Sequence, residues 1–367
     1  MVFRLSLWAI PVIVLGLCAS GCNQDEFARN LNAAKRGNAT AQFNLGSMYS
    51  DGDGVEKDVP EAIRWYTAAT EQGDAGASYN LALLYHTGKG VEKDPAEAAQ
   101  WYTKAAGLGH VKAQLNLGYM YETGEGIEKN YAEAARWYTK AAGQGHAAAQ
   151  RNLGFMYDTG RGVVEDDTEA AKWYLKSAEQ GHAKAQLLLG ILYKRGEGVK
   201  QDDAEAIRWY RAAAEQGDAD AQYNLAVGYD NGEGVEKNPA EAIRWYRAAT
   251  EQGHADAQYN LVGIYLEGEG DEENLAEVMR WCRASAEQGD AGAQFVLGLM
   301  YACDVCVEKN VIEAYMWLSL AAVEKPDAAS ERDALEKEMS KDEVAKGKHR
   351  ASEFKPKTWE EVKAQHP

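Results

Sequence analysis

The sequence predicts an all-α protein, a right-handed superhelical solenoid of α-hairpins. Three observations predict this fold: a motif that recurs every 36 residues, helical apolar spacing in both halves of each repeat, and helix-capping residues at fixed positions. The motif begins as AQFNLGSMY at Ala41 and returns eight times in all, without insertion or deletion, the last time from Ala293. One hairpin alone cannot bury its aromatic side chains, so the hairpins of residues 38–324 are expected to stack on their neighbours.

The N-terminal segment has the features of an export signal. Arg4 is followed by an apolar run from Leu5 to Cys18 and then by small residues. The run is shorter than the roughly 20 residues that a membrane-spanning helix needs, so residues 1–21 are predicted to be a signal peptide. The sequence ASGC that ends at Cys22 resembles the lipobox of bacterial lipoproteins, which implies lipid attachment to Cys22.

Two details of this signal bear on localisation. An ordinary secretory signal with a nearby cysteine is the alternative to lipidation. Asn23 is not the aspartate that retains such lipoproteins at the inner membrane, so the resemblance favours an exported, periplasmic protein anchored at the outer membrane. The anchor would then be the only contact with the membrane.

The first half of each repeat predicts a helix with one apolar face. In the first repeat the spacing i, i+4, i+7, i+8 is filled by Ala41, Leu45, Met48 and Tyr49. Tyrosine recurs at the last of these positions in all eight repeats.

The second half predicts another helix, in which tryptophan recurs in all eight repeats, beginning with Trp65. An aspartate or asparagine directly precedes this helix, and a glutamate lies three residues after that capping residue, as with Asp58 and Glu61. This spacing predicts a capping box. A glycine such as Gly73 ends the helix and suits a left-handed backbone conformation.

Polar helices are expected to cap both ends of the stack. Residues 22–37 contain the lipidated cysteine and a helix in which Arg29 and Asn30 replace the usual Trp-Tyr pair. Residues 325–354 predict two capping helices, with Ser340 as the N-cap of the second, and residues 355–367 form a tail.

The repeated pattern A-x-x-x-LG-x-x-Y, G-x-GV, EA-x-x-WY and AA-x-x-G resembles the Sel-one-like repeat, a relative of the tetratricopeptide repeat. The resemblance covers residues 38–324 and implies a noncatalytic scaffold for protein–protein interaction. With the export signal, it implies an adaptor of the bacterial cell envelope that needs no cofactor.

The formal net charge of −18 argues against nucleic acid as a partner, because a phosphate backbone would be repelled. The partner expected is a protein or peptide, and a basic segment in it would associate faster.

An envelope hydrolase, β-lactamase-like or active on the cell wall, is the alternative function. Ser352 and Lys355 match the S-x-x-K motif, but Trp359 stands where K-T-G would need glycine, so a chance match is expected.

Four histidines at equivalent repeat positions suggest a metal row. Neighbouring helices lie about 8–10 Å apart, too far for a shared zinc ion, so helix capping is expected instead and no metal site is predicted. These histidines are His110, His146, His182 and His254.

The tetratricopeptide relatives bind partners in a concave groove lined by the first helices. The positions of this chain that match the groove are Phe43, Asn44, Tyr79, Asn80, Asn116, Tyr119, Asn152, Phe155, Tyr223, Asn224, Tyr259 and Asn260. Two roles stay open for them: contact with a partner, or burial between repeats with the asparagines tying helices together.

A C-x-x-C motif replaces the glycine turn of the last repeat. In an exported protein, a disulfide between Cys303 and Cys306 could restrain this turn. Cys282 is then either a small buried residue or the partner of Cys303.

Overall fold

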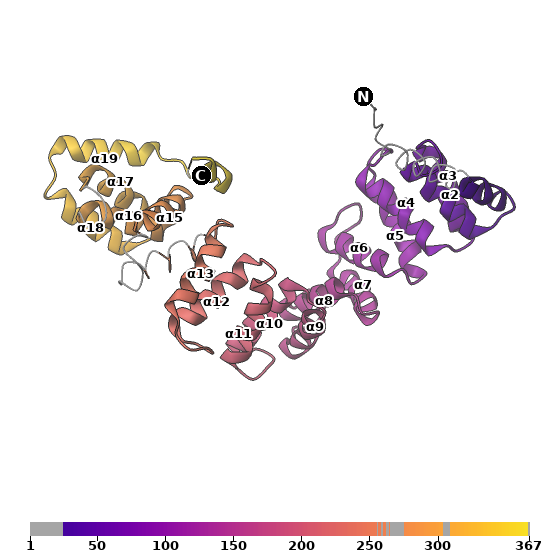
Figure 1. The fold of residues 1–367 in the computed structure, drawn as a ribbon, viewed down its shortest axis with the longest axis horizontal. Coiled ribbons are helices and arrows are strands. Elements are labelled where there is room, and N and C mark those ends of the chain that lie inside the picture. The colour runs from indigo at the N-terminus through magenta and orange to yellow at the C-terminus, as the bar shows by residue number, and fades with distance from the viewer. Residues whose placement is uncertain are drawn as a thin grey trace, which may run out of the picture. The chain divides into compact units, whose positions relative to one another are not determined.

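The computed structural model describes residues 25–254, 256–257, 260–261, 264, 275–303 and 309–365. All regular elements in these ranges are helices, which confirms the predicted all-α solenoid class (Figure 1). The chain divides into two compact units, Met1–Ser177 and Ala178–Pro367. The predicted signal peptide, Cys22, Tyr259 and Cys306 lie outside the described residues, and of Cys303 only the backbone is described.

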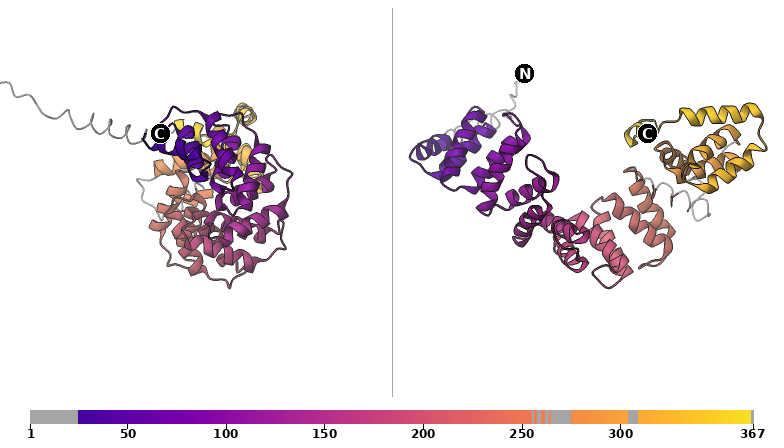
Figure 2. Two further views of the ribbon diagram at one scale, coloured as in Figure 1. Left: turned by 90° about the vertical axis from the view of Figure 1, so that its right-hand side faces the viewer. Right: turned by 180° about the vertical axis from the view of Figure 1, so that it is seen from behind.

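The first unit begins with a helix over residues 25–34. Four helix pairs follow, one per repeat, and their packing is visible in Figures 1 and 2. Their helices are α2 (Ala39–Asp51), α3 (Val59–Glu71), α4 (Ala75–Thr87), α5 (Pro95–Gly107), α6 (Val111–Thr123), α7 (Tyr131–Gly143), α8 (Ala147–Thr159) and α9 (Asp167–Glu179), which ends just inside the second unit.

The second unit continues the same pattern and adds the C-terminal helices. Its elements are α10 (Ala183–Arg195), α11 (Asp203–Ala214), α12 (Ala219–Asn231), α13 (Pro239–Thr250), α15 (Leu275–Glu287), α16 (Ala291–Cys303), α17 (Val311–Ala321), α18 (Pro326–Glu336), α19 (Lys341–Glu353) and α20 (Trp359–Gln365). No described helix is long and apolar enough to cross a membrane.

Where the structure describes the cap, the second helix of a repeat starts at the predicted residue, but the capping box is only half formed. The Asp58 carboxylate accepts the backbone N–H of Glu61 at 3.0 Å, as expected. The Glu61 side chain does not return the bond, because the backbone N–H of Asp58 donates to the Tyr49 carbonyl at 2.9 Å. Glu61 instead pairs with Arg64 one turn further along the helix at 3.3 Å. In the next repeat Glu97 instead accepts the indole N–H of Trp101 at 2.8 Å.

Buried glutamines join successive repeats. Gln114, only 4% exposed, donates to the Ala106 carbonyl at 3.1 Å and accepts from Gln144 at 2.8 Å. One side chain therefore links α5, α6 and α7 and satisfies polar atoms that would be costly to bury alone. The same glutamine pairing occurs between Gln42 and Gln72, Gln186 and Gln216, and Gln222 and Gln252.

The C-terminal helices close the second unit. Ser340 caps α19 in a full capping box with Glu343. The segment expected only as a tail contains the seven-residue helix α20, which packs against α15. Val362 of α20 is only 1% exposed. The backbone N–H of Lys357 donates to the Glu287 carbonyl at 2.8 Å, and its side chain pairs with the Glu287 carboxylate at 3.0 Å.

Candidate functional site

The asparagines of the first helices bind tyrosine hydroxyls of the preceding repeat. The side-chain nitrogen of Asn80 lies 3.2 Å from the Tyr66 hydroxyl, and this hydroxyl donates to Ser47 at 3.0 Å. Asn260 bonds to Tyr246 in the same way at 3.2 Å. Asn116 and Asn152 follow the same pattern and bond to Tyr102 and Tyr138. For Asn44 in the first repeat, the position equivalent to these tyrosines holds Asn30, and Asn44 bonds to it. Asn224 lines a cavity together with Tyr210.

These hydroxyls are proton donors at neutral pH rather than catalytic bases. Burial raises the pKa of Tyr102 to about 12. Burial, with the nearby Glu122 carboxylate, also raises the pKa of Tyr138, whose hydroxyl donates to Glu122 at 2.7 Å. The asparagines thus tie helices together, which is one of the two roles that the sequence left open.

The first set of groove aromatics is packed against neighbouring rings. The half-buried ring of Phe43 lies 6.0 Å from the ring of Tyr66. Tyr79 stacks on His110 with ring centroids 4.4 Å apart, and Tyr223 stacks on His254 at 4.7 Å. Much of the surface of these rings is therefore used inside the stack.

A second set of positions presents apolar side chains to solvent in the first unit. Leu83 on α4 is 39% exposed and Tyr119 on α6 is 49% exposed. Phe155 on α8 is half-buried, with the Arg161 guanidinium 5.3 Å from its ring centroid. We call Leu83, Tyr119 and Phe155 the exposed row. Sequence reasoning missed Leu83 because it selected only aromatic and amide side chains at these positions.

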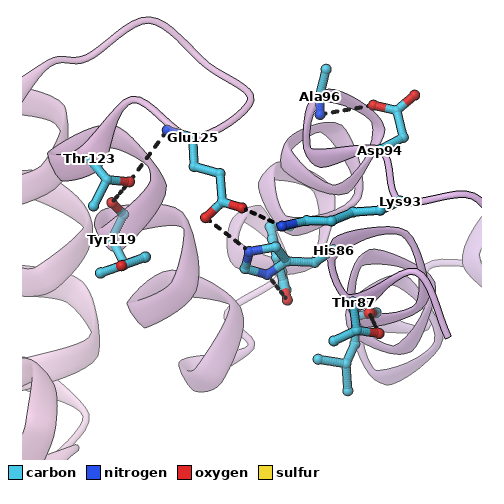
Figure 3. A network of polar contacts seen from close by, with 10 residues as sticks. His86, Thr87, Lys93, Asp94, Ala96, Tyr119, Thr123 and Glu125 are labelled. Atoms are coloured by element: carbon cyan, nitrogen blue, oxygen red, sulfur yellow. Dashed lines mark hydrogen bonds and ion pairs between the residues drawn. The ribbon is translucent and has the colours of Figure 1, made fainter.

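A polar network bridges the second and third repeats beside this row (Figure 3). His86 on α4 contacts the Glu125 carboxylate at 3.3 Å through Nε2 and the Tyr102 hydroxyl at 3.3 Å through Nδ1. Lys93 lies 3.1 Å from the other oxygen of Glu125. Hydrogen bonds from Lys93, and then from His86, lower the pKa of Glu125. The network therefore holds a carboxylate across the space between α4 and α6.

The equivalent space between α2 and α4 is open. Ser50 and Lys89 stand there at the positions of His86 and Glu125. A cavity of about 390 Å³ results, which we call the α2–α4 groove. It is lined by Ser47, Ser50, Asp51, Tyr66, Asn80, Leu83, Leu84, Thr87 and Lys89. In the second unit, the equivalent cavity between α10 and α12 measures only about 60 Å³, and Lys194 spans it to Asp203 and Glu233 at 3.2 and 2.5 Å.

The repeated histidines serve mainly as helix caps. The Nδ1 atoms of His110, His182 and His254 accept backbone N–H groups at 3.2, 3.4 and 3.3 Å. His146 makes no such bond. Over the part of the chain that the structure describes, no three His, Cys, Asp or Glu side chains gather in a way that could hold a metal ion.

The remaining candidates show no catalytic arrangement. The Ser352 hydroxyl donates to the His349 carbonyl within α19 at 2.7 Å. Cys282 is a free thiol with no exposed surface, so it takes the first of its two predicted roles. It donates to the Ala293 carbonyl at 3.5 Å, and burial raises its pKa to about 12. Such a thiol is a poor nucleophile.

The repeats match a known family model along most of the chain. The model is the Sel1 repeat, and it matches residues 39–74, 75–110, 111–146, 147–182, 183–218, 219–254, 255–290 and 291–322. The chain belongs to the Sel1 repeat family. Proteins of this family generally mediate protein–protein interactions, and the matches indicate no catalytic family.

Solved structures of other Sel1 repeat proteins agree with this assignment. The chain is similar to a protective antigen with the SLR fold, present in uropathogenic Escherichia coli strains. The two are 33% identical, with a TM-score of 0.66 and coverage of 96% of this chain and 85% of the antigen. A Sel1 repeat protein from Oxalobacter formigenes is 34% identical, with a TM-score of 0.65 and coverage of 84% and 89%. No functionally curated protein matches significantly.

Proposed function

We propose that this Sel1 repeat protein is a noncatalytic adaptor of the bacterial cell envelope that binds a protein partner through the first helices of its first unit. The observation that carries the proposal is the exposed row. Leu83 and Tyr119 are 39% and 49% exposed at equivalent positions of consecutive repeats, and Phe155 continues the row. Exposed apolar side chains that recur at equivalent positions of neighbouring repeats suit a protein-binding surface, where aromatic residues supply much of the affinity.

The charge of the chain defines the kind of partner. The formal net charge is −18, and Glu122 on α6 and Asp158 on α8 each come one helical turn after a member of the row, Tyr119 and Phe155. Such a surface would accelerate the approach of a partner with a basic segment. The same charge disfavours nucleic acid.

The place in the envelope rests on the N-terminal sequence. A signal peptide over residues 1–21 and a lipid on Cys22 would anchor the protein in the periplasm at the outer membrane. Metabolic labelling with an acyl-chain probe tests this, with membrane fractionation of the same cells. The wild type should incorporate the label and follow the outer membrane, whereas Cys22→Ser should lose both. Label retained by Cys22→Ser would refute the anchor.

Site-specific photocrosslinking in cells tests the binding face. A photoreactive residue at Tyr119 should form a discrete crosslinked product with one or a few proteins. Leu108, which is also 49% exposed but lies at the end of α5, is the matched control and should not form that product. Equal crosslinking from both positions would contradict binding at the exposed row.

A further inference from the structure

The α2–α4 groove differs from the equivalent spaces because of two substitutions within the chain. In the next repeat, His86 and Glu125 fill this space together with Lys93. Ser50 is too short to cross the groove, and Lys89 carries the opposite charge to Glu125. The third position is unchanged, because Lys57 corresponds to Lys93. The groove is therefore open through sequence differences at two of three network positions.

The lining offers both hydrogen-bonding groups and apolar surface. Ser47, Ser50 and Asn80 bond to the Tyr66 hydroxyl and Thr87 to the Leu83 carbonyl, and their remaining hydroxyl and amide atoms line the groove. Leu83 contributes exposed apolar surface. The ring of Tyr66 is only 2% exposed, so the groove has no open aromatic face on which a sugar ring or a base could stack. This mixture of groups suits a polypeptide, which has amide groups along its backbone and apolar side chains.

The charges in the groove are not paired with each other. Among the described residues, neither Asp51 nor Lys89 forms an ion pair, although both line the same cavity. Asp51 can accept hydrogen bonds from a lysine or arginine, and Lys89 can donate to backbone carbonyls. The groove thus has complementary groups for a basic side chain and for the backbone that carries it.

The groove is also continuous with the exposed row, because Leu83 belongs to both. We propose that the α2–α4 groove holds an extended segment of the protein partner, with a lysine or arginine against Asp51 and an apolar side chain against Leu83. This inference rests on the proposed function and adds the position and chemistry of the anchoring segment.

Fluorescence anisotropy with three labelled nine-residue peptides tests the groove on the purified full chain. The peptides alternate leucine with lysine, with glutamate or with serine. The lysine peptide should bind more tightly than the serine peptide, and the glutamate peptide most weakly. Equal binding of the lysine and glutamate peptides would overturn the proposal.

A double substitution closes the groove with a network that this fold already accommodates. Ser50→His with Lys89→Glu reproduces His86 and Glu125 next to Lys57. The lysine peptide should then bind at least about tenfold more weakly. The variant is more acidic than the wild type, so nonspecific attraction would strengthen binding instead. Unchanged or tighter binding would overturn the proposal.

Single substitutions keep the test decisive if the double variant does not fold. Asp51→Asn should remove the preference for the lysine peptide over the serine peptide, whereas Glu71→Gln, at an exposed acid near the end of α3, should not. Leu83→Ser should weaken binding of the lysine and serine peptides, whereas Leu108→Ser should not. If the control and groove variants behave alike, the groove is not the binding site. If the groove is excluded in this way but a photoreactive residue at Tyr119 still crosslinks a partner in cells, the proposed adaptor function stands without the groove. If Tyr119 forms no crosslink either, both proposals are wrong.

Discussion

The side-chain nitrogen of Gln144 lies 2.8 Å from the side-chain oxygen of Gln114, so a buried amide near the start of α6 is bonded to an exposed one just after α7 of the same repeat. A different pair of residues occupies the two equivalent positions in another repeat of the same chain. One repeat earlier, the two positions hold Ser78 and Leu108. The short Ser78 side chain donates to Thr70 on α3 of the preceding repeat at 3.2 Å, and Leu108 is 49% exposed to solvent. Both members of the pair change together.

This relationship predicts a coupling between the two glutamines. Gln144→Leu alone should lower the free energy of unfolding by about 1–3 kcal/mol, because a buried oxygen of Gln114 loses its donor. Adding Gln114→Ser should cost less in this background than in the wild type, since the two changes recreate the Ser78 and Leu108 arrangement. A double-mutant cycle of denaturation measurements checks this. Additive effects would contradict the coupling.

A glycine in a connecting turn should not tolerate a side chain. Gly126 has φ +71°, and a Cβ atom there would lie 2.3 Å from the backbone of Pro95. Gly126→Ala should therefore destabilise the protein by about 1–3 kcal/mol.

The matched control for Gly126 is Gly143 at the end of α7, where a Cβ atom would meet nothing within 4 Å. Gly143→Ala should be neutral or stabilising by up to about 1 kcal/mol, because alanine restricts the unfolded chain. Thermal unfolding of both variants measures the difference. Similar melting temperatures for the two would argue against the close approach to Pro95.

The histidine caps predict a loss of stability in mild acid. The neutral Nδ1 of His110 accepts the backbone N–H of Ala113, and burial, then the charge of Lys112, lowers the pKa of His110 below its ordinary 6.5. The unfolded chain therefore binds a proton before the folded chain does. The stability contributed by the neutral His110 side chain is therefore complete above pH 6.5, and it decreases as the pH falls toward the pKa of His110 in the folded protein.

His110→Asn isolates this effect, because asparagine caps α2 at the equivalent position, Asn38, without titrating. Denaturation of both proteins between pH 7.5 and 5 should show a smaller loss of stability for the variant. A parallel decline would mean that His110 does not contribute to the acid sensitivity.

The buried thiol predicts a difference in reactivity between the folded and unfolded protein. Cys282 has no exposed surface and a pKa of about 12, so an alkylating reagent should leave it unmodified in the native protein and modify it after denaturation. Mass spectrometry with and without reductant counts the thiols and also tests the predicted Cys303–Cys306 disulfide. Rapid alkylation of Cys282 in the native protein would contradict its burial.

Local patterns in the sequence were sufficient to predict the fold. The fold follows from features that lie within one repeat and recur in all eight: the 36-residue period, the tryptophan and tyrosine positions, and helix caps of the Asp58 type. Even so, the return bond expected from Glu61 was wrong, because the backbone N–H of Asp58 donates to the Tyr49 carbonyl of the preceding helix, a contact that the capping pattern does not consider.

Exposure on the first helices was decided only by the tertiary structure. Tyr79 and Tyr119 both looked like groove residues, yet Tyr79 stacks on His110 of the next repeat while Tyr119 stays 49% exposed. The α2–α4 groove depends in the same way on side chains that come from two successive repeats. The sequence by itself determined the repeat, its helices and their caps, because these are set by neighbours along the chain. Which side chains remain for a partner depends on contacts between repeats, and these exist only once the hairpins have stacked.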